Sequence, residues 1–173
     1  MSGAPRPAEE RDALLGLRPR LAAQPTSTEE AASVMSAFAR DKLAVAFVGG
    51  GTDLELGAPP ARLDAVLHTR GMARVKEHAP SDQIVAVEAG ITLAALQRHL
   101  APHRQRLSID PPFPERATVG GIVAASAFGP LRTRYGSPRD LVTRHLRALT
   151  EDAPEHTSLR ALELSLPSKS VDE

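Results

Sequence analysis

Residues 47–53, Phe47-Val48-Gly49-Gly50-Gly51-Thr52-Asp53, carry the strongest structural signal in the chain. They end a short apolar run over residues 43–48, which is typical of a buried strand. Three successive glycines permit positive φ angles and close approach of a ligand to the backbone. Their N–H groups can form a concave site for a phosphate oxygen, and Thr52 can add a hydroxyl donor. A plain flexible loop is an equally good interpretation, because the stretch is neither G-x-G-x-x-G nor a Walker A motif.

A second glycine element lies further along the chain, in Ala117-Thr118-Val119-Gly120-Gly121. A glycine pair that opens a short helix leaves N–H groups and the positive end of the helix dipole available to an anion. The alternative is close helix packing through small residues, which is the commoner reason for such a composition. Two such elements in one small chain favour a single site that holds a diphosphate from both sides.

A third candidate is the glycine-bounded stretch over residues 129–136, GPLRTRYG, which holds two arginines and the only tyrosine of the chain. Arginine can pair with phosphate, and tyrosine can stack or donate a hydrogen bond. A solvated surface loop is the alternative interpretation.

The pattern around these motifs alternates strands and helices, which favours an α/β or α+β domain. Ser27 and Glu30 fit a capping box for a first helix, Thr92 caps a second, and Pro80 lies in the turn of a hairpin. The expected strands cover residues 43–48, 65–67, 73–78 and 83–87, and the expected helices cover residues 28–40, 92–100 and part of 118–127.

Composition excludes several classes of function. The 173-residue chain has 21 basic and 21 acidic residues, a balance that argues against a dedicated nucleic-acid-binding protein. Zero cysteine excludes disulfides, thiolate zinc sites and cysteine nucleophiles in this chain. No apolar run approaches the roughly 20 residues that a membrane helix needs, and no signal-peptide pattern is present. We therefore expect no membrane span and either a cytoplasmic location or attachment to a membrane only through a partner.

Neither a metal site nor a catalytic residue emerges from the sequence. His99 and His103 are four residues apart, but Pro102 ends the helix between them, so a surface pair is favoured over a zinc site. Asp53 and the neighbouring carboxylates are interpreted as loop and turn residues.

Five motifs follow one another in a recognisable order. They are GGGT at residues 49–52, EAGITLAALQRHL at 88–100, DPP at 110–112, ATVGGIVAASAFGP at 117–130 and RYGSPRDLV at 134–142. In this order they resemble the FAD-binding domain of the vanillyl-alcohol-oxidase/PCMH flavoprotein family. The DPP and GPLRTRYGSPRDLV stretches are most similar to FAD-binding subunits of the glycolate-oxidase type. The resemblance covers residues 25–142.

The resemblance implies an α+β, PCMH-type FAD-binding fold with a complete first α/β lobe, residues 25–115, and a truncated second lobe that begins near Thr118. We expect an N-terminal extension, residues 1–24, that is loosely attached. Residues 143–173 are expected to be weakly patterned, with one half-buried strand over residues 162–166 and nothing ordered after Pro167.

The resemblance also implies a cofactor, FAD, held through its pyrophosphate. No histidine or cysteine stands where the family forms a covalent flavin link, so a non-covalent mode is expected. A small 2-hydroxy acid is the implied substrate, and a partner flavoprotein or iron–sulfur subunits are the implied partners. The expected cofactor-binding residues are Val48, Gly49, Gly50, Gly51, Thr52, Asp53, Pro111, Thr118, Val119, Gly120, Gly121, Ala124, Ala125, Ser126, Gly129, Tyr135 and Gly136.

Two functions from different classes follow. The first is an FAD-binding oxidoreductase subunit or fragment, which the preserved glycine loops favour. The second is a catalytically inactive, truncated remnant that acts as an interaction module, which the missing flavin-ring half of the family pattern favours. A nucleic-acid contact through Arg132, Arg134 and the arginines that follow is disfavoured by the zero net charge.

Overall fold

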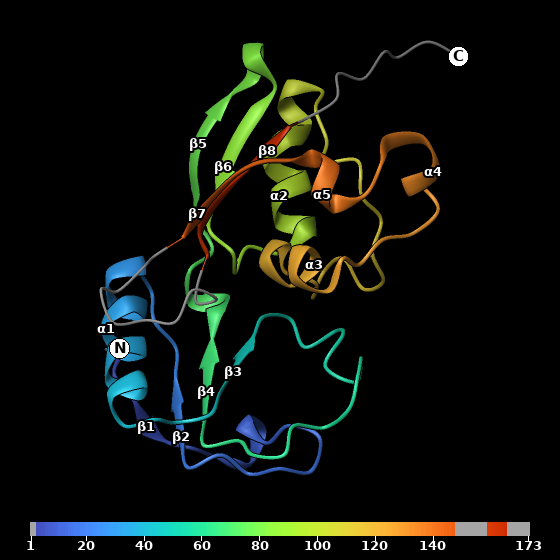
Figure 1. Cartoon of the computed structure of the whole chain (residues 1–173). Helices are drawn as coiled ribbons and strands as arrows, with labels where there is room; N and C mark the ends of the chain where they lie inside the picture. The colour runs from blue at the N-terminus through green and yellow to red at the C-terminus, as the bar shows by residue number, and fades with distance from the viewer. Residues whose placement is uncertain (1–2, 148–158, 166–173) are drawn as a thin grey trace.

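Two four-stranded sheets, one above the other in Figure 1, organise the chain in the computed structural model, which describes residues 3–147 and 159–165. The first sheet has the order β1-β2-β4-β3 and the second the order β5-β6-β8-β7. The strands are Arg6–Pro7 (β1), Leu21–Ala23 (β2), Val45–Val48 (β3), Ala65–His68 (β4), Val75–Ala79 (β5), Ile84–Val87 (β6), Val142–Arg147 (β7) and Leu159–Ser165 (β8). The α-helices are Thr28–Arg40 (α1), Leu93–Leu100 (α2), Val119–Ala125 (α3), Arg132–Tyr135 (α4) and Pro138–Leu141 (α5), and the 3-10 turns are Glu10–Asp12 (η1), Thr69–Gly71 (η2), Pro80–Asp82 (η3) and Ala101–His103 (η4).

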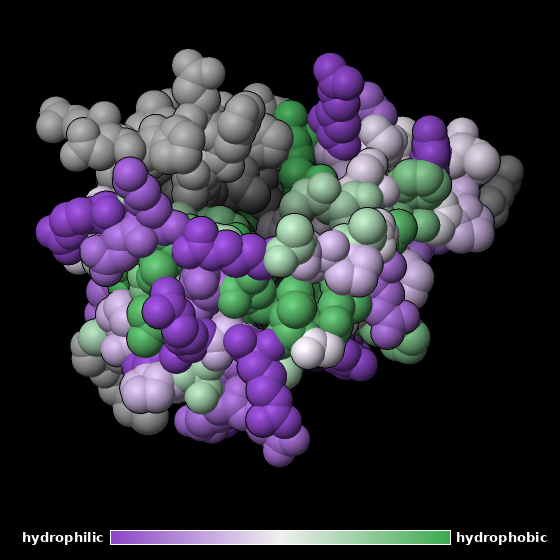
Figure 2. Space-filling view, turned by 60° about the horizontal axis from the view of Figure 1, so that its bottom comes forward, coloured by the Kyte–Doolittle hydropathy of each residue, from purple (hydrophilic) through white to green (hydrophobic). Residues whose placement is uncertain are grey.

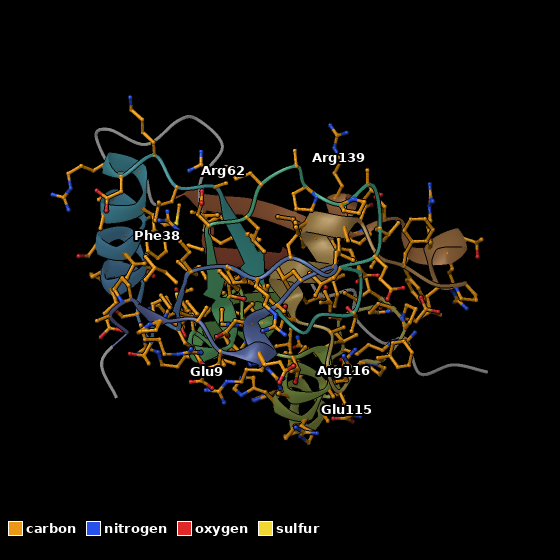
Figure 3. The ribbon with its side chains drawn as sticks, turned by 90° about the horizontal axis from the view of Figure 1, so that it is seen from below. Glu9, Phe38, Arg62, Glu115, Arg116 and Arg139 are labelled. Atoms are coloured by element: carbon orange, nitrogen blue, oxygen red, sulfur yellow. The ribbon has the colours of Figure 1, made fainter. Side chains whose placement is uncertain are left out.

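In the first sheet, β4 lies between β2 and β3 and pairs with both in parallel. Its Ala65, Val66 and Leu67 are fully buried, because both faces of the strand are covered. Burial of both faces explains why the sequence of this strand is an unbroken apolar run and not an alternation of apolar and polar residues. On one face, Phe38 of α1 packs against Ala65 and Leu67 and lies on the sheet side of the helix in Figure 3.

The start of α1 agrees with the predicted residue range but differs in its cap. Ser27 Oγ accepts a hydrogen bond from the Glu30 N–H at 3.2 Å, as a capping box requires. The Glu30 carboxylate, however, accepts from the N–H and hydroxyl of Thr26, at 2.8 and 3.0 Å, and not from the Ser27 N–H. Glu30 therefore fixes the residue before the cap, and this tethers the chain as it enters the helix.

Residues 3–24 are not the loosely attached extension that the sequence predicted. Strand β1 pairs with β2, and β2 pairs in parallel with the central β4. Leu14 and Leu17 then pack on the second face of the sheet, against Val48, Leu63 and Val66. The sequence did not reveal this because strands of two and three residues beside prolines carry no periodic pattern.

Asp12 holds this N-terminal segment in place. Its fully buried carboxylate accepts two hydrogen bonds from the Arg6 guanidinium, at 2.8 and 3.1 Å, and one from the Glu9 N–H at 2.8 Å. His68 Nε2 at the end of β4 lies 2.8 Å from Asp12 Oδ1. Burial raises the pKa of the Asp12 carboxyl, but the hydrogen bonds from Arg6, Glu9 and His68 outweigh it and hold that pKa well below its ordinary value.

The second sheet begins with the predicted hairpin, in which β5 and β6 pair antiparallel around η3. Helix α2 covers it through Leu93, Leu96 and Leu100, and α3 adds Val119 and Ile122 to the same core. Because β6 also pairs with β8, this hairpin belongs to the second sheet. The division between the sheets thus falls between β4 and β5, far before Thr118, where the sequence placed the second lobe.

Beyond Leu141 the structure adds a strand that the sequence did not predict. Strand β7 starts at Val142 and pairs antiparallel with β8, which overlaps the strand expected over residues 162–166. The polar, arginine-rich sequence of β7 conceals its strand character. The expectation that nothing after Pro167 is ordered concerns residues outside the described part of the chain.

Replacing Asp12 by asparagine should lower the free energy of unfolding by about 1–3 kcal/mol at pH 7, because buried donors lose their charged acceptor. The folded-state pKa of Asp12 is depressed, so its contribution is complete above its unfolded pKa of about 3.9 and is lost as the pH falls further. The difference between wild type and Asp12→Asn should therefore shrink below about pH 4. Urea unfolding at several pH values measures it, with exposed Asp82→Asn as control. A constant difference down to pH 2, or none at pH 7, would contradict the assignment.

Candidate cofactor-binding site

The glycine loop, residues 49–52, follows β3 without an intervening residue. Gly51 has a φ of +69°, in the left-handed region that favours glycine. Within the described part of the chain, no hydrogen bond uses the backbone N–H of Gly49, Gly50 or Gly51. Three consecutive donors at the carboxyl end of a strand are therefore available to an anion.

The structure brings the two glycine elements into direct contact. A Cβ added to Gly49 would lie 2.1 Å from Thr118 Oγ1, and one added to Gly50 would lie 1.9 Å from the carbonyl oxygen of Arg116. No side chain fits at such distances, so these glycines allow the loop backbone to pack on the segment before α3. The side chains of Glu115 and Arg116 lie on the α2 side of that segment (Figure 3), where Glu115 pairs with Arg98.

The N–H groups at the start of α3 are not free, contrary to the prediction. The Val119 N–H donates to Ile91 O at 2.9 Å, and the Gly120 N–H donates to Ala89 O at 2.8 Å. The Gly121 N–H donates to Thr118 Oγ1 at 3.3 Å. The alternative interpretation is correct here, because a Cβ on Gly120 would lie 2.7 Å from the Ala89 Cβ. Contact of this segment with a cofactor through other atoms stays a prediction.

Thr52 and Asp53 close the glycine loop on itself. The Thr52 hydroxyl, expected as a donor to a ligand, donates to Asp53 Oδ2 at 2.8 Å. Val48, the last residue of β3, is buried under the N-terminal segment. The ligand-binding capacity of the loop therefore rests on its backbone.

A surface hollow of about 510 Å³ lies beside the glycine loop, between the N-terminal segment and the residues after the loop. Apolar side chains gather on the face of the molecule shown in Figure 2, between polar ones. Sequence reasoning missed the hollow because it treated the N-terminal segment as detached. The lining residues are Ala13, Leu14, Leu15, Gly51, Thr52, Asp53, Leu54, Glu55 and Leu56.

Asp110, in the DPP motif, ties two of the predicted regions together. Its carboxylate accepts from the N–H groups of Gly129 and Leu131, at 3.0 and 3.1 Å. A Cβ on Gly129 would lie 2.4 Å from Asp110 O, so Gly129 is required for this close approach. Pro111 follows and is buried. The structural role of Asp110 was missed, although the motif itself had been singled out.

Within the described part of the chain, no hydrogen bond links the remaining predicted residues to the glycine loop. Ala124, Ala125 and Ser126 are exposed at the end of α3. Tyr135 and Gly136 end α4, which Figure 1 places on the far side of α3 from β3. Their part in cofactor binding stays a prediction.

Across residues 3–147 and 159–165, no three His, Cys, Asp or Glu side chains are grouped so that they could hold a metal ion. The His78 ring instead contacts those of His99 and His103, with centroids 5.2 and 4.8 Å apart, and its Nε2 lies 2.8 Å from Gln105 Oε1. None of the helices in the described part of the chain is both long and apolar enough to span a membrane.

Gly50→Ala should destabilise the protein by about 1–3 kcal/mol, because the added methyl would force the loop away from the Arg116 carbonyl. Gly121→Ala is the matched control, since its Cβ would approach only Thr118 Oγ1, at 3.1 Å. Thermal unfolding of the two variants measures the difference. Equal melting temperatures would show that the loop and the Arg116 backbone are not in contact.

Comparison with known proteins identifies the family. The model of the FAD binding domain family matches residues 19–153. A D-lactate dehydrogenase of Archaeoglobus fulgidus is 36% identical over 121 residues, which cover 69% of this chain and 26% of that protein. Glycolate oxidase subunit GlcD of Escherichia coli (strain K12) is 27% identical over 119 residues, covering 69% of this chain and 24% of the relative.

The fold is shared with solved structures. An alkyldihydroxyacetonephosphate synthase superposes with a TM-score of 0.74 at 18% identity, over 87% of this chain and 34% of that one. The chain thus spans about a quarter of the curated relatives and a third of this structure. The sequence predicted a resemblance to glycolate-oxidase subunits in particular. The matched relatives form a wider group, because they also include D-lactate dehydrogenases. With the PCMH-type mixed α/β fold and the family model covering most of its length, the chain belongs to the FAD-binding domain family.

Proposed function

We propose that this chain is the FAD-binding part of a flavoenzyme that oxidises a small 2-hydroxy acid, with FAD held non-covalently through its pyrophosphate. The observation that carries the proposal is the glycine loop, whose three free N–H donors follow β3. Membership of the FAD-binding family supports the cofactor. The names of the relatives, a D-lactate dehydrogenase and a glycolate oxidase subunit, support the substrate class.

The residues of the loop fit a diphosphate. Phosphate oxygens accept hydrogen bonds from consecutive N–H groups, and glycine leaves room for them to approach. The Asp53 carboxylate, which would repel a phosphate, is held by the Thr52 hydroxyl at 2.8 Å. No histidine or cysteine stands in the loop, so the loop itself supplies no nucleophile for a covalent flavin link.

Packing prepares the loop for binding. Gly49 and Gly50 lie against Thr118 and Arg116, and β3 is paired with β4 up to Val48. A loop held in this way loses little conformational freedom when a ligand binds, which favours affinity. The bound flavin would accept the hydride in the oxidation, and the chain would bind and orient it.

The glycolate-oxidase type is the finer form of this proposal. One of the relatives is named as a subunit of glycolate oxidase, which supports an assembly with a partner flavoprotein or iron–sulfur subunits. Because these 173 residues contain no cysteine, any iron–sulfur cluster of such an assembly would have to be bound by cysteines outside them.

Thr52→Glu should weaken FAD binding at least about tenfold, since a carboxylate beside the three N–H donors would repel the pyrophosphate. Thr52→Gln is the matched control: it has the same size, also removes the hydroxyl bond to Asp53, and carries no charge. Titration of FAD, followed by flavin fluorescence, measures both affinities. Equal affinities in the two variants, or no binding by the wild type, would refute the proposed loop contact.

The substrate class is tested separately on wild-type protein loaded with FAD. Anaerobic addition of D-lactate or glycolate should bleach the flavin absorbance, whereas acetate, which lacks the hydroxyl to be oxidised, should not. FAD binding without any bleaching would support the cofactor and contradict oxidation of these acids by the chain itself.

A further inference from the structure

Three arginine side chains lie over two aromatic rings in and beside α4. The Arg132 Cζ lies 4.1 Å from the centroid of the Phe128 ring. The Arg106 and Arg134 Cζ atoms lie 5.3 and 5.5 Å from the centroid of the Tyr135 ring, and Arg106 also donates to Tyr135 Oη at 3.0 Å. These five residues form what we call the arginine surface.

The positive charge of this surface is not balanced by ion pairs. Within residues 3–142, whose side chains the structure describes, no carboxylate lies within 4.0 Å of the guanidinium groups of Arg106, Arg132 or Arg134. The neighbouring Asp140 accepts from the N–H and hydroxyl of Ser137, both at 2.7 Å. These hydrogen bonds lower the pKa of its carboxyl, and the charges of Arg139 and Arg132 lower it further, so Asp140 partly compensates Arg132 without forming an ion pair with it. Three guanidinium groups are therefore available to an external anion.

The surface is built on a fixed backbone. Asp110 holds Gly129 and Leu131 by their N–H groups, which secures the segment between Phe128 and α4. Arg106, from the segment after η4, joins the same surface through its hydrogen bond to Tyr135 Oη. Guanidinium planes that rest on rings in a tethered segment have lost part of their rotamer freedom before binding, and this favours bidentate contact with carboxylates.

We infer that the arginine surface is a docking site for an acidic protein segment. Carboxylates suit the paired N–H groups of guanidinium. Nucleic acid is disfavoured because Arg106 and Arg134 lie over the Tyr135 ring and Arg132 lies over the Phe128 ring, which leaves less aromatic surface for bases to stack on. Phe128 is 40% exposed and adds an apolar contact for a folded or extended peptide.

The test uses a fluorescein-labelled peptide of about ten residues, rich in glutamate, with fluorescence anisotropy as the measurement. Double substitution R132Q/R134Q should weaken binding at least about tenfold at low ionic strength. The matched control is R40Q/R70Q, which removes the same charge from two exposed arginines, one at the end of α1 and one in η2. Binding by the control should change less than about twofold.

The variant Phe128→Leu tests whether the aromatic ring that orients Arg132 contributes to peptide binding, beyond the positive charge of the arginines. It keeps every arginine but removes the ring under Arg132, and it should weaken peptide binding about two- to fivefold, corresponding to the usual strength of an exposed cation–π contact. If the two double variants weaken peptide binding equally, or if Phe128→Leu leaves it unchanged, the arginine surface is not the docking site that we propose. Tighter binding of a single-stranded oligonucleotide of the same charge would overturn the choice of an acidic protein segment.

Discussion

The contact on which this structure depends is the packing of Gly49 and Gly50 on the backbone of residues 116–118. An added Cβ would lie 2.1 Å from Thr118 Oγ1 in one case and 1.9 Å from Arg116 O in the other, so only glycine serves at both positions. The loop comes from the first sheet, and the segment it touches leads into α3, which covers the second. The contact therefore helps to join the two sheets, and the same glycines leave three N–H donors free for an anion.

There is a physical reason why the same glycines both pack against residues 116–118 and leave their N–H groups free. A loop that binds a phosphate through its backbone must be rigid, but glycine is the residue that gives the most conformational freedom to the unfolded chain. The freedom is removed here by packing on both sides of the loop: β3 is paired with β4, and Gly49 and Gly50 are pressed against the segment before α3. Only glycine lets the loop backbone pack this closely against the segment before α3. That packing in turn restricts the backbone freedom that glycine would otherwise give the loop.

Most elements with a strong periodic pattern could be predicted from the sequence. Helices α1 and α2 and the β5-β6 hairpin start at the expected residues or close to them, since caps, apolar spacing and a turn proline are local signals. Strands β1 and β2 could not be predicted, because they consist of two and three residues and are stabilised by pairing with distant β4. The family resemblance placed the start of the second lobe near Thr118, and no local signal corrected it, because nothing local shows that β6 pairs with β8.

In the candidate site, too, the sequence predicts which segments matter but not which individual hydrogen bonds they make. The glycine loop and the Thr118–Gly121 turn were expected to hold a diphosphate from two sides, and the structure brings them into direct contact. Composition, however, cannot tell whether an N–H group is free. At Gly49 to Gly51 it is free, whereas at Val119 and Gly120 it is bonded to Ile91 and Ala89. Free N–H donors in one glycine element and sheet-to-helix packing by the other therefore arise from nearly the same residue types. The arginine surface follows a different principle, since there charged side chains, and not backbone dipoles, face solvent. A chain with zero net charge can thus carry two separate regions suited to anions, one of which needs no charged residue.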